Sequence, residues 1–387
     1  QDSRTRLEEL TTELARATQK FSENVLDSTY AWSKNILDES LLGGLPESTK
    51  IAARETAKEK EMDGWVFTLH APSIMPIMKY LDDDSIRKEF WEASSKIGWE
   101  GERDNTDLIR RILKLRQEKA EILGKKDYAD VVLERRMAGS GARADEFVSD
   151  LRDKTANAFA RENDQLIAFK AGKTGRQAEL LEPWEYSYWS EKQMKEKYNF
   201  DEEDMRPYLP IDSVLSGMFS LVTEIFRLRI EERSTSHDGQ PVNLVEGDER
   251  DPVDVWHPEV KFYEVFDSKD HRHLGSFYAD WHPRPNKRSG AWMNYVKMGT
   301  PGDDGSPRGP HLGLMCGNMT APVDDKPALL THDEANTVFH EFGHLLHHLC
   351  AEVKFKRLSM GTVPWDYVEL PSQIMENWLW ERESLDL

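Results

Sequence analysis

The spacing of hydrophobic positions divides the chain into a helical part and a part with strands. From residue 1 to about residue 235, apolar side chains recur every three or four positions, which is the period of amphipathic helices. Leu7, Leu10 and Leu14 begin this pattern, and a longer amphipathic run covers residues 108–124. We therefore predict that residues 1–235 are mostly helical.

The pattern changes after residue 235. Residues 236–258 are rich in Asp, Gly and Pro, which predicts a loop or a junction between domains. Beyond them, short apolar or alternating runs predict strands separated by loops. These runs cover residues 260–266, 274–281, 291–296 and 312–319. The sequence thus predicts an α+β protein that is mostly helical, with a small sheet in residues 259–387.

A predicted helix follows the last of these strands and carries the candidate chemistry. Thr331 is a plausible N-cap, and Glu334 lies three residues later, which is the spacing of a capping box. Within this helix, residues 340–344 read His-Glu-Phe-Gly-His. A pattern this short can occur by chance, and its place in a capped helix after several strands is what favours a functional interpretation.

The His-Glu-x-x-His pattern predicts a metal site. His340 and His344 are four residues apart, so they lie on one face of a helix and can present two imidazole nitrogens to one ion. Glu341 is adjacent to the first histidine and is free to act as a general base toward water. The pattern is therefore typical of a zinc-dependent hydrolase.

The third protein ligand of such a site remains open at this stage. Zinc in catalytic sites has three protein ligands and one position for water. Asp366 could cap a helix with Glu369 three positions later, although Pro371 is comfortable only in the first turn of that helix. The downstream carboxylates that could complete the site are Glu352, Asp366, Glu369, Glu376, Glu381 and Glu383.

Composition and charge exclude several other classes of protein. Among 387 residues, 51 Lys and Arg oppose 71 Asp and Glu, giving a net charge of −20. An acidic chain without a basic run does not favour nucleic-acid binding. The sequence has no stretch of 18 uninterrupted apolar residues, so no transmembrane helix is predicted. The two cysteines, Cys316 and Cys350, are too few for a disulfide scaffold.

Longer motifs resemble a known family. The segment 339–378 contains FHEFGHLLH, then GTVPWDYVELPSQ, then ENW. Upstream matches are GLPES at 44–48, GWVFTLHAPS at 64–73, RDN at 103–105, YADWHPRPNKRSGAWM at 278–293 and PALLTHDEANTVF at 327–339. Together they resemble the zinc peptidase family that contains thimet oligopeptidase, oligopeptidase A and dipeptidyl carboxypeptidase. The phrase GTVPWDYVELPSQIMENW looks closest to oligopeptidase A.

This resemblance implies roles for individual residues. By their place in the motifs, His340, His344 and Glu369 match the ligands of one zinc ion per chain, and Glu341 matches the catalytic glutamate. The resemblance also implies a zincin-like (gluzincin) core in residues 259–387. That core would belong to a large helical, two-lobed channel architecture and to a cytoplasmic enzyme.

The resemblance further implies that both termini of the family are missing. Family members continue beyond the ELPSQ helix into a region whose Tyr and His side chains bind substrate and stabilise the oxyanion. The catalytic core in residues 259–387 is therefore expected to be incomplete at its C-terminal end. We expect the missing C-terminal region to be a partner of this chain, which a separate polypeptide could supply.

Two further groups of residues are candidates for supporting roles. His347 shares a helix face with the two ligand histidines, and Asp366 or Glu376 could accept a hydrogen bond from a ligand imidazole. The alternatives are packing for His347 and capping or solvation for the acids. We also predict an edge strand that pairs with an extended peptide, as opposed to an internal strand. Its residues are Gly313, Leu314, Met315, Cys316 and Gly317.

The sequence therefore predicts a zinc-dependent oligopeptidase that hydrolyses short peptides. Glu341 would activate the attacking water and pass its proton to the leaving amine. A dipeptidyl carboxypeptidase of the same family is one alternative, and a catalytically incomplete zinc- or peptide-binding fragment is another. The intact set of His340, His344, Glu369 and Glu341 argues against a decayed site. Short peptides are the expected partners, with neither nucleic acid nor a membrane.

Overall fold

The computed structural model describes residues 2–284, 287–288, 290–302, 308–322 and 327–387. The chain forms two compact units, Gln1–Asp201 and Glu202–Leu387. The described residues are mostly helical with small mixed sheets, which confirms the predicted α+β class. Within these described ranges, no helix is long and apolar enough to cross a membrane.

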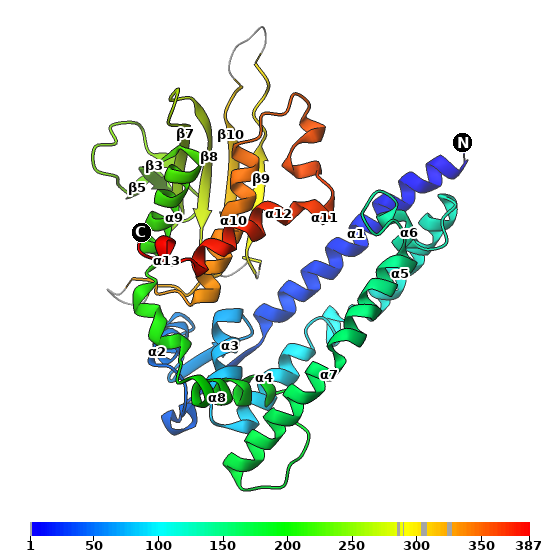
Figure 1. Ribbon diagram of the computed structural model, residues 1–387, viewed down its shortest axis with the longest axis vertical. Helices are drawn as coiled ribbons and strands as arrows, with labels where there is room; N and C mark the ends of the chain where they lie inside the picture. Colours follow the sequence, from blue (N-terminus) through cyan, green and yellow to red (C-terminus); the bar gives the residue numbers. More distant parts are fainter. Residues whose placement is uncertain (1, 285–286, 289, 303–307, 323–326) are drawn as a thin grey trace. The chain divides into compact units, whose positions relative to one another are not determined.

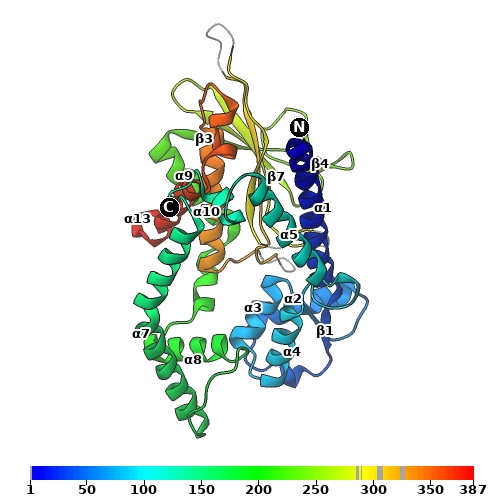
Figure 2. The ribbon, with the colours of Figure 1, turned by 90° about the vertical axis from the view of Figure 1, so that its right-hand side faces the viewer.

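The first unit consists largely of helices (Figure 1). Helices α1 and α5 run side by side, and their apolar faces meet at Leu10, Leu14, Ile112 and Leu115 (Figure 2). The spacing of leucines predicted the helices, but it did not predict that these two faces pack together. Its helices are α1 (Asp2–Ala31), α2 (Glu47–Glu59), α3 (Ala71–Tyr80), α4 (Asp84–Ser95), α5 (Thr106–Ile122), α6 (Tyr128–Leu133), α7 (Gly141–Thr174) and α8 (Tyr186–Tyr198).

A two-stranded ribbon in the first unit was not predicted. Strand β1 (Ser33–Ile36) pairs antiparallel with β2 (Trp65–Thr68). The side chain of Phe67 is fully buried and packs against Phe90 of α4, so the ribbon forms part of a local core. Four-residue strands are too short to give a clear period in the sequence.

The second unit contains a mixed five-stranded sheet in the order β3-β7-β8-β10-β9. Strand β10 runs parallel to β8, and the other neighbours are antiparallel. The four predicted strands correspond to β7, β8, β9 and β10. The sheet strands are β3 (Leu228–Arg233), β7 (Lys261–Asp267), β8 (His273–Asp280), β9 (Trp292–Lys297) and β10 (His311–Cys316).

The loop predicted at residues 236–258 is wrong, because this segment contains most of a second, three-stranded sheet. Residues 1–235, which were predicted to be mostly helical, also contain strand β3. The two compact units divide at Asp201. The small sheet has the order β5-β4-β6, formed by β4 (Thr235–His237), β5 (Gln240–Asn243) and β6 (Val253–Asp254).

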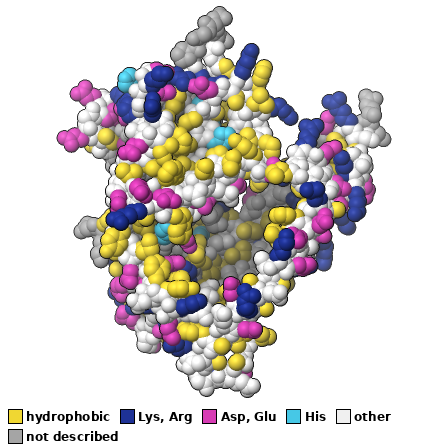
Figure 3. Space-filling model, in the orientation of Figure 1, with side chains coloured by type: hydrophobic (Ala, Val, Ile, Leu, Met, Phe, Trp, Pro, Cys, Tyr) yellow, Lys and Arg dark blue, Asp and Glu magenta, His cyan; other side chains and the backbone are white. Residues whose placement is uncertain are grey.

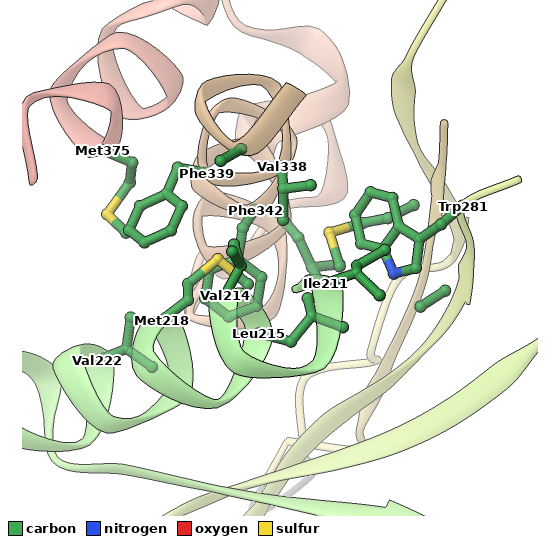
Figure 4. Close-up of a cluster of buried hydrophobic side chains, with 14 of the residues drawn as sticks. Ile211, Val214, Leu215, Met218, Val222, Trp281, Val338, Phe339, Phe342 and Met375 are labelled. Carbon is green, nitrogen blue, oxygen red and sulfur yellow. The ribbon is translucent and has the colours of Figure 1, made fainter. Parts of the chain in front are cut away.

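The packing of α9 explains why the unit boundary lies before residue 235. Helix α9 (Ile211–Phe226) buries Val214, Met218 and Val222 in the same core as Phe342 of α10 (His332–Leu349). Figure 4 shows these side chains pointing toward one another, with Met375 of α12 (Leu370–Glu376) beside them. Burial of this apolar face stabilises the second unit, so α9 belongs to it.

Candidate metal centre

The start of α10 is fixed by the predicted capping box. The Thr331 hydroxyl accepts a hydrogen bond from the Glu334 backbone N–H at 3.1 Å, and the Glu334 carboxylate accepts one from the Thr331 N–H at 2.9 Å. The same carboxylate accepts the Thr320 backbone N–H at 2.7 Å. The helix therefore begins at a defined residue, and this fixes the direction of its later side chains.

Three side chains converge at the middle of α10. Nε2 of His340 lies 3.2 Å from Oε2 of Glu369, and Nε2 of His344 lies 3.1 Å from the same oxygen. One donor atom from each side chain lies within 4.8 Å of the other two. In the described part of the chain, this is the only group of three or more His, Cys, Asp or Glu side chains with that geometry.

Glu369 comes from the segment that follows α10 in sequence. It lies between the short helix α11 (Trp365–Val368) and α12, where it is the N-cap residue of α12. Pro371 falls in the first turn of α12, where a backbone N–H would have no acceptor within the helix, so the missing N–H of proline costs nothing. The structure thus accommodates the proline by starting a new helix after Glu369.

Gly343 allows α12 to approach α10 closely. A Cβ atom at this position would lie 2.5 Å from the Pro371 carbonyl oxygen and 2.6 Å from Cα of Ser372. Both are backbone atoms, which cannot move aside as a flexible side chain can. Sequence reasoning treated this glycine only as a variable position of the motif, although its small size is what brings Glu369 to the histidines.

The three residues predicted to support the ligands, Glu376, His347 and Asp366, have three different environments in the structure. Oε1 of Glu376 lies 2.6 Å from Nδ1 of His340 and is positioned to accept a hydrogen bond from it. His347 places its ring 6.2 Å from that of Tyr367, and no partner is found for its buried Nδ1 within the described ranges. Asp366 is exposed on α11. Glu376 therefore has the contact that an imidazole ligand requires.

Glu341 is buried beside this group, with 6% of its surface exposed. Burial raises the pKa of its carboxyl group, and both the nearby His340 imidazole and a hydrogen bond from the Met293 backbone N–H oppose that rise. A raised pKa favours proton acceptance near neutral pH. Glu341 lies outside the three-residue donor group.

The donor set fits a zinc ion. Two imidazole nitrogens and one carboxylate oxygen are ligands that zinc takes in catalytic sites. With Nδ1–H of His340 directed to Glu376, its Nε2 is left free to bind a metal. The buried Nδ1 of His344 has no hydrogen-bond partner in the described residues. The half-exposed Glu369 leaves one side of the group open to solvent.

The predicted edge strand is internal, so that prediction is wrong. Gly313 in β10 pairs with Phe277 of β8 on one side and with Tyr295 of β9 on the other. The edge of the described sheet on this side is β9, whose residues from Asn294 to Lys297 are exposed. A Cβ atom at Gly313 would lie 2.5 Å from the Leu345 side chain of α10, so this glycine serves helix packing.

A helix with the His-Glu-x-x-His pattern and a carboxylate from the following helical segment defines a class of metal-dependent hydrolases. Comparison with known proteins identifies the family of this chain. The model of peptidase family M3 matches residues 77–387, and the chain belongs to this family.

The most similar relatives include oligopeptidase A of Escherichia coli (strain K12), which is 39% identical over 383 residues. That alignment covers 97% of this chain and 53% of the relative. Dipeptidyl carboxypeptidase of the same organism is 30% identical over 389 residues, covering 98% and 52%. The predicted family, and the greater similarity to oligopeptidase A, are thus confirmed. The chain spans about half the length of the curated relatives it matches.

Proposed function

We propose that this chain carries the catalytic metal centre of a zinc-dependent oligopeptidase that hydrolyses short peptides in the cytoplasm. The observation that carries the proposal is the convergence of His340, His344 and Glu369 on one point beside Glu341, in a chain of peptidase family M3. The higher identity to oligopeptidase A than to dipeptidyl carboxypeptidase supports an oligopeptidase over the alternative activity.

Each residue of the site has a distinct role in this proposal. His340, His344 and Glu369 would hold one zinc ion, and Glu376 would orient the His340 ring. Zinc bound there would polarise the scissile carbonyl and lower the pKa of water. Glu341 accepts the proton of the attacking water and then donates it to the leaving amine, which must be protonated to depart.

Strand β9 is the proposed binding edge for the substrate backbone. Its outer side has no neighbouring strand among the described residues, and it begins at Trp292, beside the residue whose N–H reaches Glu341. An extended peptide can add to such an edge through main-chain hydrogen bonds. The mixed sheet, the antiparallel edge strand and α10 packed against the sheet support a zincin-like core for this unit.

Replacement of Glu369 tests the ligand set. Glu369→Ala removes one of three donor atoms, so we expect zinc affinity to fall by more than the roughly 10–100-fold that loss of an outer hydrogen-bond partner costs. The measurement is competition for zinc with a chromophoric chelator. Glu381→Ala is the matched control, because this exposed acid lies outside the donor group. Equal affinity in Glu369→Ala and the parent would remove Glu369 from the site.

Replacement of Glu341 tests the base. Glu341→Gln keeps the size of the side chain but cannot accept the proton, so turnover should fall by roughly 10²–10⁴-fold. The assay uses a quenched fluorescent peptide. It compares the Glu341→Gln variant with a parent protein whose turnover is measurable. Zinc affinity should be unchanged, because Glu341 is not a ligand. A variant that kept both zinc and near-parent turnover would exclude Glu341 as the base.

A further inference from the structure

Ser372 touches the oxygen of Glu369 that faces both histidines. Its hydroxyl lies 2.8 Å from Oε2 of Glu369 and 2.9 Å from the backbone carbonyl oxygen of the same residue. Oε2 is also the atom that lies 3.1–3.2 Å from Nε2 of His340 and His344. The Glu369 carbonyl oxygen already accepts the Gln373 backbone N–H at 2.9 Å, so the single hydroxyl proton of Ser372 is not needed there and can be donated to Oε2.

The surroundings hold this serine in place. Ser372 is completely buried, with 0% of its surface exposed. Its Cα lies at the close contact of α12 with α10, only 2.6 Å from where a Cβ atom at Gly343 would stand. The hydroxyl therefore has few alternative directions, and its position follows from the packing of the two helices.

The Glu369 side chain, in contrast, needs an external restraint. It is 47% exposed and has several rotatable bonds, so it loses conformational entropy when its carboxylate is fixed at one point. A hydrogen bond from a rigid, buried donor lowers that loss, because it holds the carboxylate before a metal arrives. Partners of this kind around a ligand typically change metal affinity by roughly 10–100-fold.

We propose that Ser372 is a positioning residue that holds Oε2 of Glu369 at the place where it binds the metal. The inference rests on the proposed zinc site and acts only through Glu369. It concerns neither proton transfer nor contact with substrate.

Two serine-to-alanine variants separate this role from general stability. Ser372→Ala in the 387-residue chain should weaken zinc binding by roughly 10–100-fold in chelator competition. Ser359→Ala is the matched control, because Ser359 is also buried and bonds the Lys356 carbonyl at 2.7 Å, outside the donor group. It should lower the melting temperature of the metal-free protein without changing zinc affinity. Circular dichroism confirms that each variant is folded.

A second pair of variants has equal shape and differs only in the hydroxyl. Ser372→Thr keeps a donor for Glu369, whereas Ser372→Val replaces it with a methyl group. Any strain from the added carbon is common to both, so zinc should bind more tightly to the threonine variant. This comparison tests the hydroxyl directly even if the smaller alanine variant proves unstable.

A double-mutant cycle gives the decisive result. In a Glu369→Ala background, Ser372→Ala should cause no further loss of zinc affinity, because the residue it positions is gone. An equal loss in both backgrounds, or equal zinc affinity for the threonine and valine variants, would overturn the role of Ser372 and leave the zinc site intact. Zinc binding that Glu369→Ala does not weaken would overturn both proposals.

Discussion

At the scale of single residues, the site depends on Gly343, which has no side chain. Gly343 lies where α10 and α12 are closest, and the backbone of Pro371 and Ser372 occupies the space that a Cβ atom would need. Its backbone conformation is helical, so the glycine is not required by a turn. The close approach alone explains it, and the same approach brings Glu369 to the two histidines.

Gly343→Ala should therefore damage both stability and metal binding. The added methyl group must push α12 away from α10, and we expect a loss of about 1–3 kcal/mol in the free energy of unfolding, as for overpacked cores. Displacement of Glu369 should also weaken zinc binding. Urea unfolding and chelator competition measure the two effects.

The control for this change is Gly172→Ala in α7. A Cβ atom there would meet nothing within 4 Å, so the gain in helix propensity should raise stability by up to about 1 kcal/mol. If Gly343→Ala behaved like Gly172→Ala, the contact between α10 and α12 would not limit the position of Glu369.

At the scale of elements, His311 of β10 links the sheet to the end of α10. Its Nε2 lies 3.0 Å from the Ala351 carbonyl oxygen, and its Nδ1 accepts the Gly299 backbone N–H at 3.2 Å. A neutral imidazole matches this pair of partners, with one donor and one acceptor. A second proton would have to sit on Nδ1, where it would face the Gly299 N–H and break that hydrogen bond. Burial and the neighbouring His348 lower the pKa of His311 to about 4.

Acid should therefore destabilise the second unit in a definite range of pH. The unfolded chain takes up a proton at His311 near pH 6.5, whereas the folded chain does so only near pH 4. Stability is fully present above the unfolded pKa and falls as the pH drops toward 4, by up to about 3 kcal/mol. Urea unfolding across this range measures the loss. His311→Gln should flatten the slope, and an unchanged slope would assign the pH dependence to other groups.

The sequence predicted those elements whose signals are local. The capping box at Thr331, the helical face of His340 and His344, and four strands of the large sheet each follow from neighbouring residues. The position of Gly313 in the sheet could not be predicted in this way, because an internal strand differs from an edge strand only by its partners. The same holds for α9, whose amphipathic pattern does not say which core it joins.

The third ligand shows the same limit at the site itself. Spacing left six carboxylates open, and only the family motif favoured Glu369. Its contact with the histidines depends on the turn before Pro371 and on the packing at Gly343, which join segments about 30 residues apart. The role proposed for Ser372 was not predicted, although its place three residues after Glu369 is a spacing at which side chains meet in a helical turn.

At the scale of the whole molecule, the second unit exposes large hydrophobic side chains near the proposed site. Yellow side chains gather over the region that carries α10, α11 and α12 (Figure 3). The most exposed of those in the last 25 residues are Trp365 and Trp380, each at 73%, with Ile374 at 57%. Exposed apolar groups in such numbers are typical of surfaces that bind another partner or segment.

The last prediction concerns how much catalysis the 387 residues support. The chain contains the three proposed ligands and the base, and it spans about half the length of its relatives. From the family resemblance alone, we expect the oxyanion donors to lie outside residues 1–387. Loss of one such donor costs roughly 10²–10³-fold in rate, and poorer positioning of the substrate adds to that loss. We therefore expect one zinc ion per chain but little turnover of a quenched fluorescent peptide.

The comparison enzyme for this measurement is oligopeptidase A of Escherichia coli, assayed with equal zinc loading, and the Glu341→Gln variant of the chain sets the background. Because an oxyanion needs donors that do not move during the reaction, added zinc should not restore the rate. Turnover within about tenfold of the comparison enzyme corresponds to a difference of only about 1.4 kcal/mol in the activation barrier. Such turnover would contradict the prediction, provided that the Glu341→Gln substitution abolished it. Residues 1–387 would then supply the oxyanion donors themselves, and a search for them would begin on β9, whose backbone lies next to Glu341.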